Sequence, residues 1–270
     1  MKLTDYLGDK PFWRVTVKLA VPVALQNVLT SSFQLVDTLM VSQLGDVTLS
    51  AVGMAAQWGW LCGLLGFGLC SGMSVFISQY WGVKDIKNIR RTLGIDIILG
   101  GGMALLFTAI AIFAAPQVLG LFSSDPRVIE LGTEYLHIVA ISYFFTSMSF
   151  AINFNCRAIH MLKVPTAINT LALVINLVFN YLLIFGKFGF PKLGVKGAAL
   201  ATLLARLVEF LLMYLCVYLQ KGHPLAAKIR ELFSFDRTVH PRTQDLPAGH
   251  RFRRRMELGQ LGLLHRVWYA

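Results

Sequence analysis

The sequence has few charged residues, which make up 14% of its 270 positions, against about 25% in a typical soluble domain. Hydrophobic residues make up 56%. Its four cysteines (Cys62, Cys70, Cys156 and Cys216) show no metal-ligand spacing, and we interpret them as small packing residues. Enzyme motifs are lacking too, with no G-x-S-x-G, no H-E-x-x-H and no phosphate-binding loop. The composition argues against an enzyme and indicates a polytopic membrane protein.

Six apolar segments follow one another, each near or above the ~20 residues that a helix needs to cross a bilayer. Short polar connections join them. The sequence therefore predicts an all-α membrane protein in which six transmembrane helices form a lobe over residues 15–220, after an N-terminal lead at 1–14 and before a basic tail at 221–270. The segments lie at about 15–41, 49–78, 92–115, 129–155, 166–186 and 197–219.

Lys and Arg favour one side of the predicted membrane. The N-terminal lead, the second loop and the fourth loop carry four, four and two of them, whereas the first, third and fifth loops carry none, one and three. This bias predicts that both termini are cytoplasmic, with the fifth loop as the exception. The first segment is too long for a signal peptide and lacks a cleavage site, so we expect a multi-pass protein of the cytoplasmic (inner) membrane.

The first segment carries a polar stripe. At about 100° per residue, seven polar residues share one face of the predicted helix. Asp37 would lie about 12 Å inside the membrane edge if that edge is near Gly45, and an ionisable group at such depth indicates a functional site. The alternative is an Asp exposed at a helix end. The stripe consists of Gln26, Asn27, Thr30, Ser31, Gln34, Asp37 and Thr38.

Two later segments also carry polar faces. Those of the fourth (Ser142, Thr146, Ser149 and Asn153) are best explained as interhelical hydrogen bonding, at about 0.6 kcal/mol per contact. The fifth segment has Asn169, Asn176 and Asn180 on one face. The last two are one turn apart and offer amide oxygens, which together with a carboxylate could hold a hard monovalent cation. We expect this face to meet the polar stripe of the first segment.

Two further features predict helix packing. In the sixth segment Arg206 and Glu209 are spaced i,i+3, which predicts a structural ion pair facing the bundle, with coupling-ion chemistry as the alternative. Thr202 lies on the same face at the depth of Asp37. In the second segment, Gly68 and Gly72 predict a face for close helix approach.

Three motifs in this order resemble the multidrug and toxic compound extrusion (MATE) family over about residues 10–235. Members of that family have twelve spans in two six-helix lobes and export amphiphilic organic compounds in exchange for Na⁺ or H⁺. The resemblance therefore implies a small-molecule amphiphilic substrate, a lipid bilayer and a missing second lobe as partners, with no cofactor beyond the coupling ion. The motifs are Pro22 with Val36-Asp37-Thr38-Leu39-Met40-Val41 and Gly45, Gln79-Tyr80-Trp81-Gly82-Val83-Lys84-Asp85 before Arg90-Arg91, and Gly194-Val195-Lys196-Gly197-Ala198-Ala199-Leu200-Ala201-Thr202.

The resemblance also implies site residues. It places Asp37, Asn176, Asn180 and Thr202 at the cation-binding site of the N-terminal lobe, where Asp37 would hold any Na⁺. Some members have a carboxylate where Asn180 stands, so the choice between Na⁺ and H⁺ stays open. The loop at 157–165 also departs from the family's small-residue pattern. The polar faces add four cavity-lining candidates: Asn27, Gln34, Thr38 and Asn153.

Two other functions remain open. A lipid-linked precursor flippase of related architecture would move an amphiphilic lipid without exporting drugs. The 270-residue chain could instead be an inactive fragment.

The tail is basic, with 10 Lys and Arg against 4 Asp and Glu in the last 50 residues. It could bind anionic lipid or RNA, or it could be a frameshifted end. Arg253-Arg254-Arg255 favours lipid over RNA, because the tail has no interleaved aromatic pattern or nucleic-acid-binding fold. We expect no nucleic-acid partner.

We expect that residues 239–270 are translated in a shifted frame and are disordered. When the last two nucleotides of each codon join the first of the next, the codons from Val239 permit F-I-R-A-L-K-T-S-L-P-V-I-V-F-D-E-G-W-S-L-G, which resembles the opening of the family's seventh span. The Trp is forced, because Met256 is ATG and Glu257 begins with G. Sequencing the coding DNA tests this: the shifted frame should continue into further apolar spans, and an early stop codon there would refute it.

Overall fold

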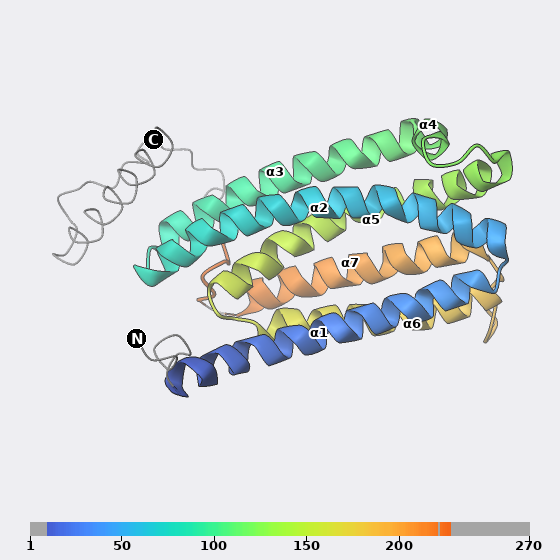
Figure 1. Ribbon diagram of the computed structural model, residues 1–270. Helices are drawn as coiled ribbons and strands as arrows, with labels where there is room; N and C mark the ends of the chain where they lie inside the picture. Colours follow the sequence, from blue (N-terminus) through green and yellow to red (C-terminus); the bar gives the residue numbers. More distant parts are fainter. Residues whose placement is uncertain (1–9, 221, 228–270) are drawn as a thin grey trace, which may run out of the picture. The chain divides into compact units, whose positions relative to one another are not determined.

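The computed structural model describes residues 10–220 and 222–227, and the regular secondary structure within them is helical. In this described part, long helices run side by side (Figure 1). They are α1 (Lys10–Ser42), α2 (Asp46–Gly82), α3 (Ile86–Phe113), the short α4 (Ala115–Gly120), α5 (Pro126–Ala158), α6 (Lys163–Phe185) and α7 (Val195–Leu219).

The long helices coincide with the six apolar segments, and α4 is an addition that the sequence did not predict. Five of them, α2, α3, α5, α6 and α7, are long and apolar enough to cross a membrane. α1 has 33 residues but is not among these five. A sixth crossing by α1, and the cytoplasmic position of both termini, remain predictions.

Local sequence sets several helix ends. Asp85 precedes α3, and its carboxylate accepts a hydrogen bond from the backbone amide of Asn88 at 3.1 Å. Asp125 precedes α5 and accepts from the amide of Arg127 at 2.9 Å. Such caps satisfy amides that have no partner within the helix. α6 ends at Gly186 in the left-handed conformation, which glycine adopts without steric cost. These caps fix where the helices begin and end.

α5 is the central helix of the bundle. It packs against α2, α3, α4 and α7, whereas α6 packs against α7 on one side and α1 on the other. α1 has its main contact with α6 and a smaller one with α2, and Figure 1 shows it beside α6 at one edge. The position of α1 therefore depends mostly on what its side chains contact on α6.

The core is divided into two apolar clusters. One includes Phe107 and Leu136, and the other includes Ile89, Ile152 and Met213. Many large apolar side chains are exposed instead, among them Leu35 on α1, which is 67% exposed. A lipid bilayer solvates such side chains as well as a protein core does. The outer surface is therefore that of a protein embedded in lipid.

Glycines allow the closest helix contacts, but at other positions than the sequence predicted. A Cβ atom on Gly197 in α7 would lie 2.5 Å from the carbonyl oxygen of Leu183 in α6. Among the described residues, no atom lies within 4 Å of such a Cβ on Gly68 or Gly72, the predicted pair, so the prediction of a close-packing face there was wrong within this lobe. Both glycines lie on the exposed side of α2. Glycine spacing shows which face of a helix consists of small residues, but it does not show whether another helix packs against that face.

Residues 222–227 pack on the lobe although the sequence assigned them to the tail. Leu225 is 1% exposed and joins the cluster around Ile89 and Met213. Arg90 Nε donates to the carbonyl of Pro224 at 3.3 Å. The packed region thus extends beyond the predicted boundary at residue 220. The rest of the predicted tail, including the frameshift interval 239–270, lies outside the described residues.

We predict that Gly197→Ala destabilises the lobe because the added methyl must push α7 away from the α6 backbone. Overpacking of this kind typically costs about 1–3 kcal/mol. Thermal unfolding of the chain in detergent measures the effect. The control is Gly68→Ala, which meets open space and should leave the midpoint unchanged or raise it, since alanine favours helices. Equal midpoints for the two variants would contradict the close contact.

Candidate cation site

Asp37 faces α6 from the last third of α1. Its carboxylate accepts a hydrogen bond from the side-chain amide of Asn180. Asp37 is partly buried, whereas Leu35 and Leu39, on the other side of α1, are exposed. The polar stripe thus meets α6 at this carboxylate, which answers the alternative of an Asp merely exposed at a helix end.

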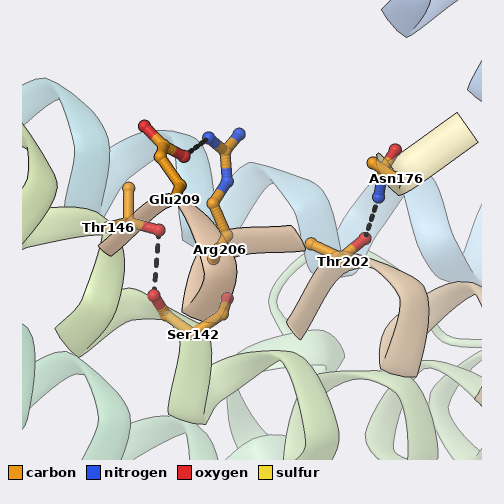
Figure 2. Close-up of polar contacts among 6 residues, drawn as sticks. All are labelled: Ser142, Thr146, Asn176, Thr202, Arg206 and Glu209. Atoms are coloured by element: carbon orange, nitrogen blue, oxygen red, sulfur yellow. Dashed lines mark hydrogen bonds and ion pairs between the residues drawn. The ribbon is translucent and has the colours of Figure 1, made fainter. Parts of the chain in front are cut away.

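Hydrogen bonds continue from Asn180 to α7. The Asn180 amide also donates to Asn176 Oδ1 at 3.3 Å, one turn earlier on α6. Asn176 Nδ2 in turn lies 3.4 Å from Thr202 Oγ1, to which it donates (Figure 2). Thr202 donates to the carbonyl of Ala198 at 3.1 Å. The four residues predicted to bind a cation are therefore joined in one chain across α1, α6 and α7.

Tyr135 joins this cluster from α5. Its phenol lies close to Thr202 and near the charge of Asp37. The sequence analysis missed this residue. The available signal was general: the hydroxyl of a buried Tyr usually finds a polar partner.

The cluster is rich in oxygen and poor in cations. Asn180 is 0% exposed, and its Oδ1 has no hydrogen-bond partner among the described residues. The salt bridges found in the described part, Lys196–Glu134 and Arg206–Glu209, do not include Asp37. The carboxylate thus has neutral partners beside an unused amide oxygen. Such oxygen donors suit a hard cation, and a carboxylate alone suits a proton.

The four cavity-lining candidates divide into two groups. Asn27, Gln34 and Thr38 are exposed along α1, and Thr38 Oγ1 donates to the carbonyl of Gln34 at 2.9 Å. Asn153 is instead buried inside the lobe on α5, and its Oδ1 has no hydrogen-bond partner within the described chain. Asn153 is not part of the cluster around Asp37. Helical spacing predicted which face of α5 it lies on, but could not predict which residues cover that face.

The predicted ion pair on α7 is confirmed. Arg206 Nη1 lies 2.7 Å from Glu209 Oε2, and Glu209 is 3% exposed (Figure 2). The pair faces the bundle on the Glu209 side. A carboxylate this deeply buried needs such a partner, because removing one charge would leave the other unpaired.

The polar face of α5 differs from the expectation of interhelical hydrogen bonds. Ser142 Oγ donates to the carbonyl of Val139 at 2.6 Å. Thr146 Oγ1 donates to the carbonyl of Ser142 at 2.9 Å, a bond that Figure 2 shows. Both bonds stay within α5, so the prediction of interhelical bonds was wrong for these two residues. Hydroxyls on helices often bond to the carbonyl three or four residues earlier, which satisfies them without a partner helix.

A second buried carboxylate was also missed. Asp96 lies within α3 and is 0% exposed. The rule that singled out Asp37, an ionisable residue inside an apolar segment, applies to it equally.

We predict that Gln34→Cys and Asn176→Cys form a disulfide on oxidation. Each lies about one turn before a partner in the Asp37–Asn180 contact, and bridging needs Cβ atoms about 3.5–4.5 Å apart. Gel mobility after oxidation measures the cross-link in a background with the native cysteines replaced. Leu35→Cys with Asn176→Cys is the control, since Leu35 points away from α6, and it should remain unlinked. Absence of the first cross-link in every condition would disprove the shared face.

Comparison with known proteins supports this architecture. The family model MatE matches residues 22–182. The probable multidrug resistance protein YoeA of Bacillus subtilis is 31% identical over 239 residues, which are 88% of this chain and 50% of YoeA. The probable multidrug resistance protein NorM of Rhizobium meliloti is 30% identical over 193 residues, which are 71% of this chain and 41% of NorM.

Solved structures show the same fold. An outward-facing multidrug resistance MATE family transporter superimposes with a TM-score of 0.72 at 22% identity, over 80% of this chain and 47% of that one. An inward-facing one gives a TM-score of 0.68 at 23% identity, over 80% and 48%. This chain spans about half the length of the relatives that it matches. With the family model covering more than half of its residues, the chain belongs to the MatE family of multi-pass membrane transporters.

Proposed function

We propose that this chain is the N-terminal lobe of a cation-coupled antiporter that exports drugs or other amphiphilic organic compounds across the cytoplasmic membrane. Asp37 is the proposed binding group for the coupling ion, Na⁺ or H⁺. Asn176, Asn180 and Thr202 are the proposed oxygen donors around it. Two relatives carry the name multidrug resistance protein, which supports this class of substrate.

The observation that carries the proposal is the bonding of Asp37. Its carboxylate contacts the neutral Asn180 amide across the α1–α6 boundary, and the described salt bridges leave it without a basic partner. An unpaired negative charge at this position is costly inside a membrane, so the carboxylate favours a cation that can bind and dissociate. The unpartnered Asn180 Oδ1 supplies a second oxygen beside it.

Ion binding at Asp37 would bias the position of α1. A bound cation competes with the Asn180 amide for the carboxylate and removes its negative charge. Because α1 has its main contact with α6, a change at this one bond alters much of what fixes the helix. An ion that binds one arrangement more tightly than the other shifts the equilibrium between them, which is the requirement for alternating access.

The oxygen donors favour Na⁺ as the first ion to test. Hard cations take about six oxygen ligands, and the cluster offers a carboxylate, two amide oxygens and a hydroxyl. A proton needs only the carboxylate. The two ions therefore depend differently on Asn176, which is hydrogen-bonded to Asn180, the direct partner of Asp37.

The substrate path needs the second lobe. In transporters built from two lobes, substrate binds at the interface between them, and the exposed polar residues Asn27, Gln34 and Thr38 are the proposed contribution of this lobe. A single lobe without that interface is therefore expected to move no substrate.

The test is exchange in vesicles by a full-length protein in which a second lobe follows this one. Asp37→Asn should lower substrate exchange driven by an imposed ion gradient about 5- to 150-fold, since coupling between sites is typically worth about 1–3 kcal/mol. Gradients of Na⁺ at constant pH and of pH at constant Na⁺ are applied separately. Asn176→Leu should weaken Na⁺-driven exchange more than H⁺-driven exchange.

Asp46→Asn is the matched control, because Asp46 is an exposed carboxylate in the first turn of α2 and should leave exchange unchanged. Undiminished exchange by Asp37→Asn would refute the role of Asp37. Movement of an amphiphilic lipid in place of drugs would identify a flippase instead.

A further inference from the structure

Asp96 and Asn155 form a buried polar pair between α3 and α5. Asn155 Nδ2 donates to Asp96 Oδ2 at 2.9 Å, and both residues are 0% exposed. The pair is distinct from the cluster around Asp37, although α5 contributes Asn155 to the one and Tyr135 to the other. The described hydrogen bonds of the two clusters have no residue in common.

The groups around Asp96 are neutral at physiological pH. The titratable side chains near it are the thiol of Cys70, from α2, and the phenol of Tyr214, from α7. The Tyr214 hydroxyl is directed to Met148 Sδ at 3.8 Å. Neither salt bridge of the described residues includes Asp96. An ionised Asp96 would thus be a buried charge without a counter-charge, which proteins avoid by neutralising the group.

Both partners have an unused oxygen. Asp96 Oδ1 and Asn155 Oδ1 are each buried without a hydrogen-bond partner in the described part of the chain. The oxygen of an ionised carboxylate and the oxygen of a neutral amide can only accept hydrogen bonds, so these two atoms cannot bond to each other. One proton on the carboxyl supplies the missing donor, because a carboxylic acid both donates and accepts. An acid and an amide can then be joined by two hydrogen bonds in place of one.

The space nearby suits a proton better than a metal ion. Gly100 lies one turn after Asp96, and a Cβ atom there would lie 3.0 Å from Ser147 Oγ of α5. A Cβ on Gly101 would lie 3.0 Å from Met148 Cε. α3 and α5 are therefore closely packed beside the pair. Hard cations need about six oxygen ligands, whereas the unpartnered oxygens of this pair number two.

We propose that Asp96 and Asn155 form a proton-binding site between α3 and α5, in which Asp96 is a neutral carboxylic acid at neutral pH. The proton is held by the carboxyl of Asp96 and shared with the amide oxygen of Asn155, with the Cys70 thiol nearby. Loss of the proton would leave an unpaired charge where α2, α3 and α5 meet. The site does not depend on the proposed antiport or on Asp37.

Infrared spectroscopy of the whole chain in lipid vesicles at neutral pH tests the proposal. The carbonyl stretch of a protonated carboxyl is separate from the bands of a carboxylate, and it shifts to lower frequency in D₂O. We expect this band in the unmodified chain and its loss in Asp96→Asn. Asp46→Asn, which changes an exposed carboxylate, should keep it. A spectrum in which Asp96→Asn removes carboxylate bands and leaves the carboxylic acid band unchanged would overturn the proposal.

Two further variants keep Asp96 in place in case Asp96→Asn fails to fold. Asn155→Leu should move the carboxyl band to higher frequency, because a carbonyl that loses a hydrogen bond stiffens. Cys70→Ala should also move it, whereas Cys156→Ala, which removes a buried thiol from α5, should not. A band unmoved by Asn155→Leu would refute the pairing. Because Asp37 is intact in all of these variants, failure of the exchange experiment and failure of this one are separate results.

Discussion

The contact between the Asp37 carboxylate and the Asn180 amide is the interaction on which the position of α1 depends. α5 holds α2, α3 and α7 together through wide apolar surfaces, but α1 touches mainly α6. Its outer face carries exposed residues such as Leu35, which lipid solvates as well as protein would. The hydrogen bond between Asp37 and Asn180 therefore contributes more to the position of α1 than any single hydrogen bond contributes to the position of α5.

This arrangement joins a helix that has few contacts to one that is closely packed on its other side. α6 is fixed to α7 by the close approach of Gly197 to the backbone of Leu183, a contact that tolerates little displacement. The amides of Asn176 and Asn180 are thus presented from a firm surface, and Asp37 approaches them from the less constrained helix. A cation bound between α1 and α6 would act on α1, the helix with fewer contacts. A small binding energy has its largest structural effect on such a helix.

The membrane also affects which partners the charged and polar side chains of the helices need. Arg206 and Glu209 neutralise each other on α7, and Ser142 and Thr146 bond to their own helix. Asp37 and Asp96 have neutral partners instead. Inside a membrane such carboxylates favour a bound proton or cation, which is the physical basis of the roles proposed for both residues.

Much of this protein is determined by the sequence alone. Apolar length predicted the long helices, helical periodicity predicted the polar stripe of α1, and the i,i+3 spacing of Arg206 and Glu209 predicted their ion pair, because these features depend on neighbours in the chain. The tertiary structure decided what depends on neighbours in space. It brought Tyr135 beside Thr202, paired Asp96 with Asn155 and made Gly197 rather than Gly68 the point of closest packing. A helical pattern fixes which face a residue lies on, and only packing fixes which other helix that face meets.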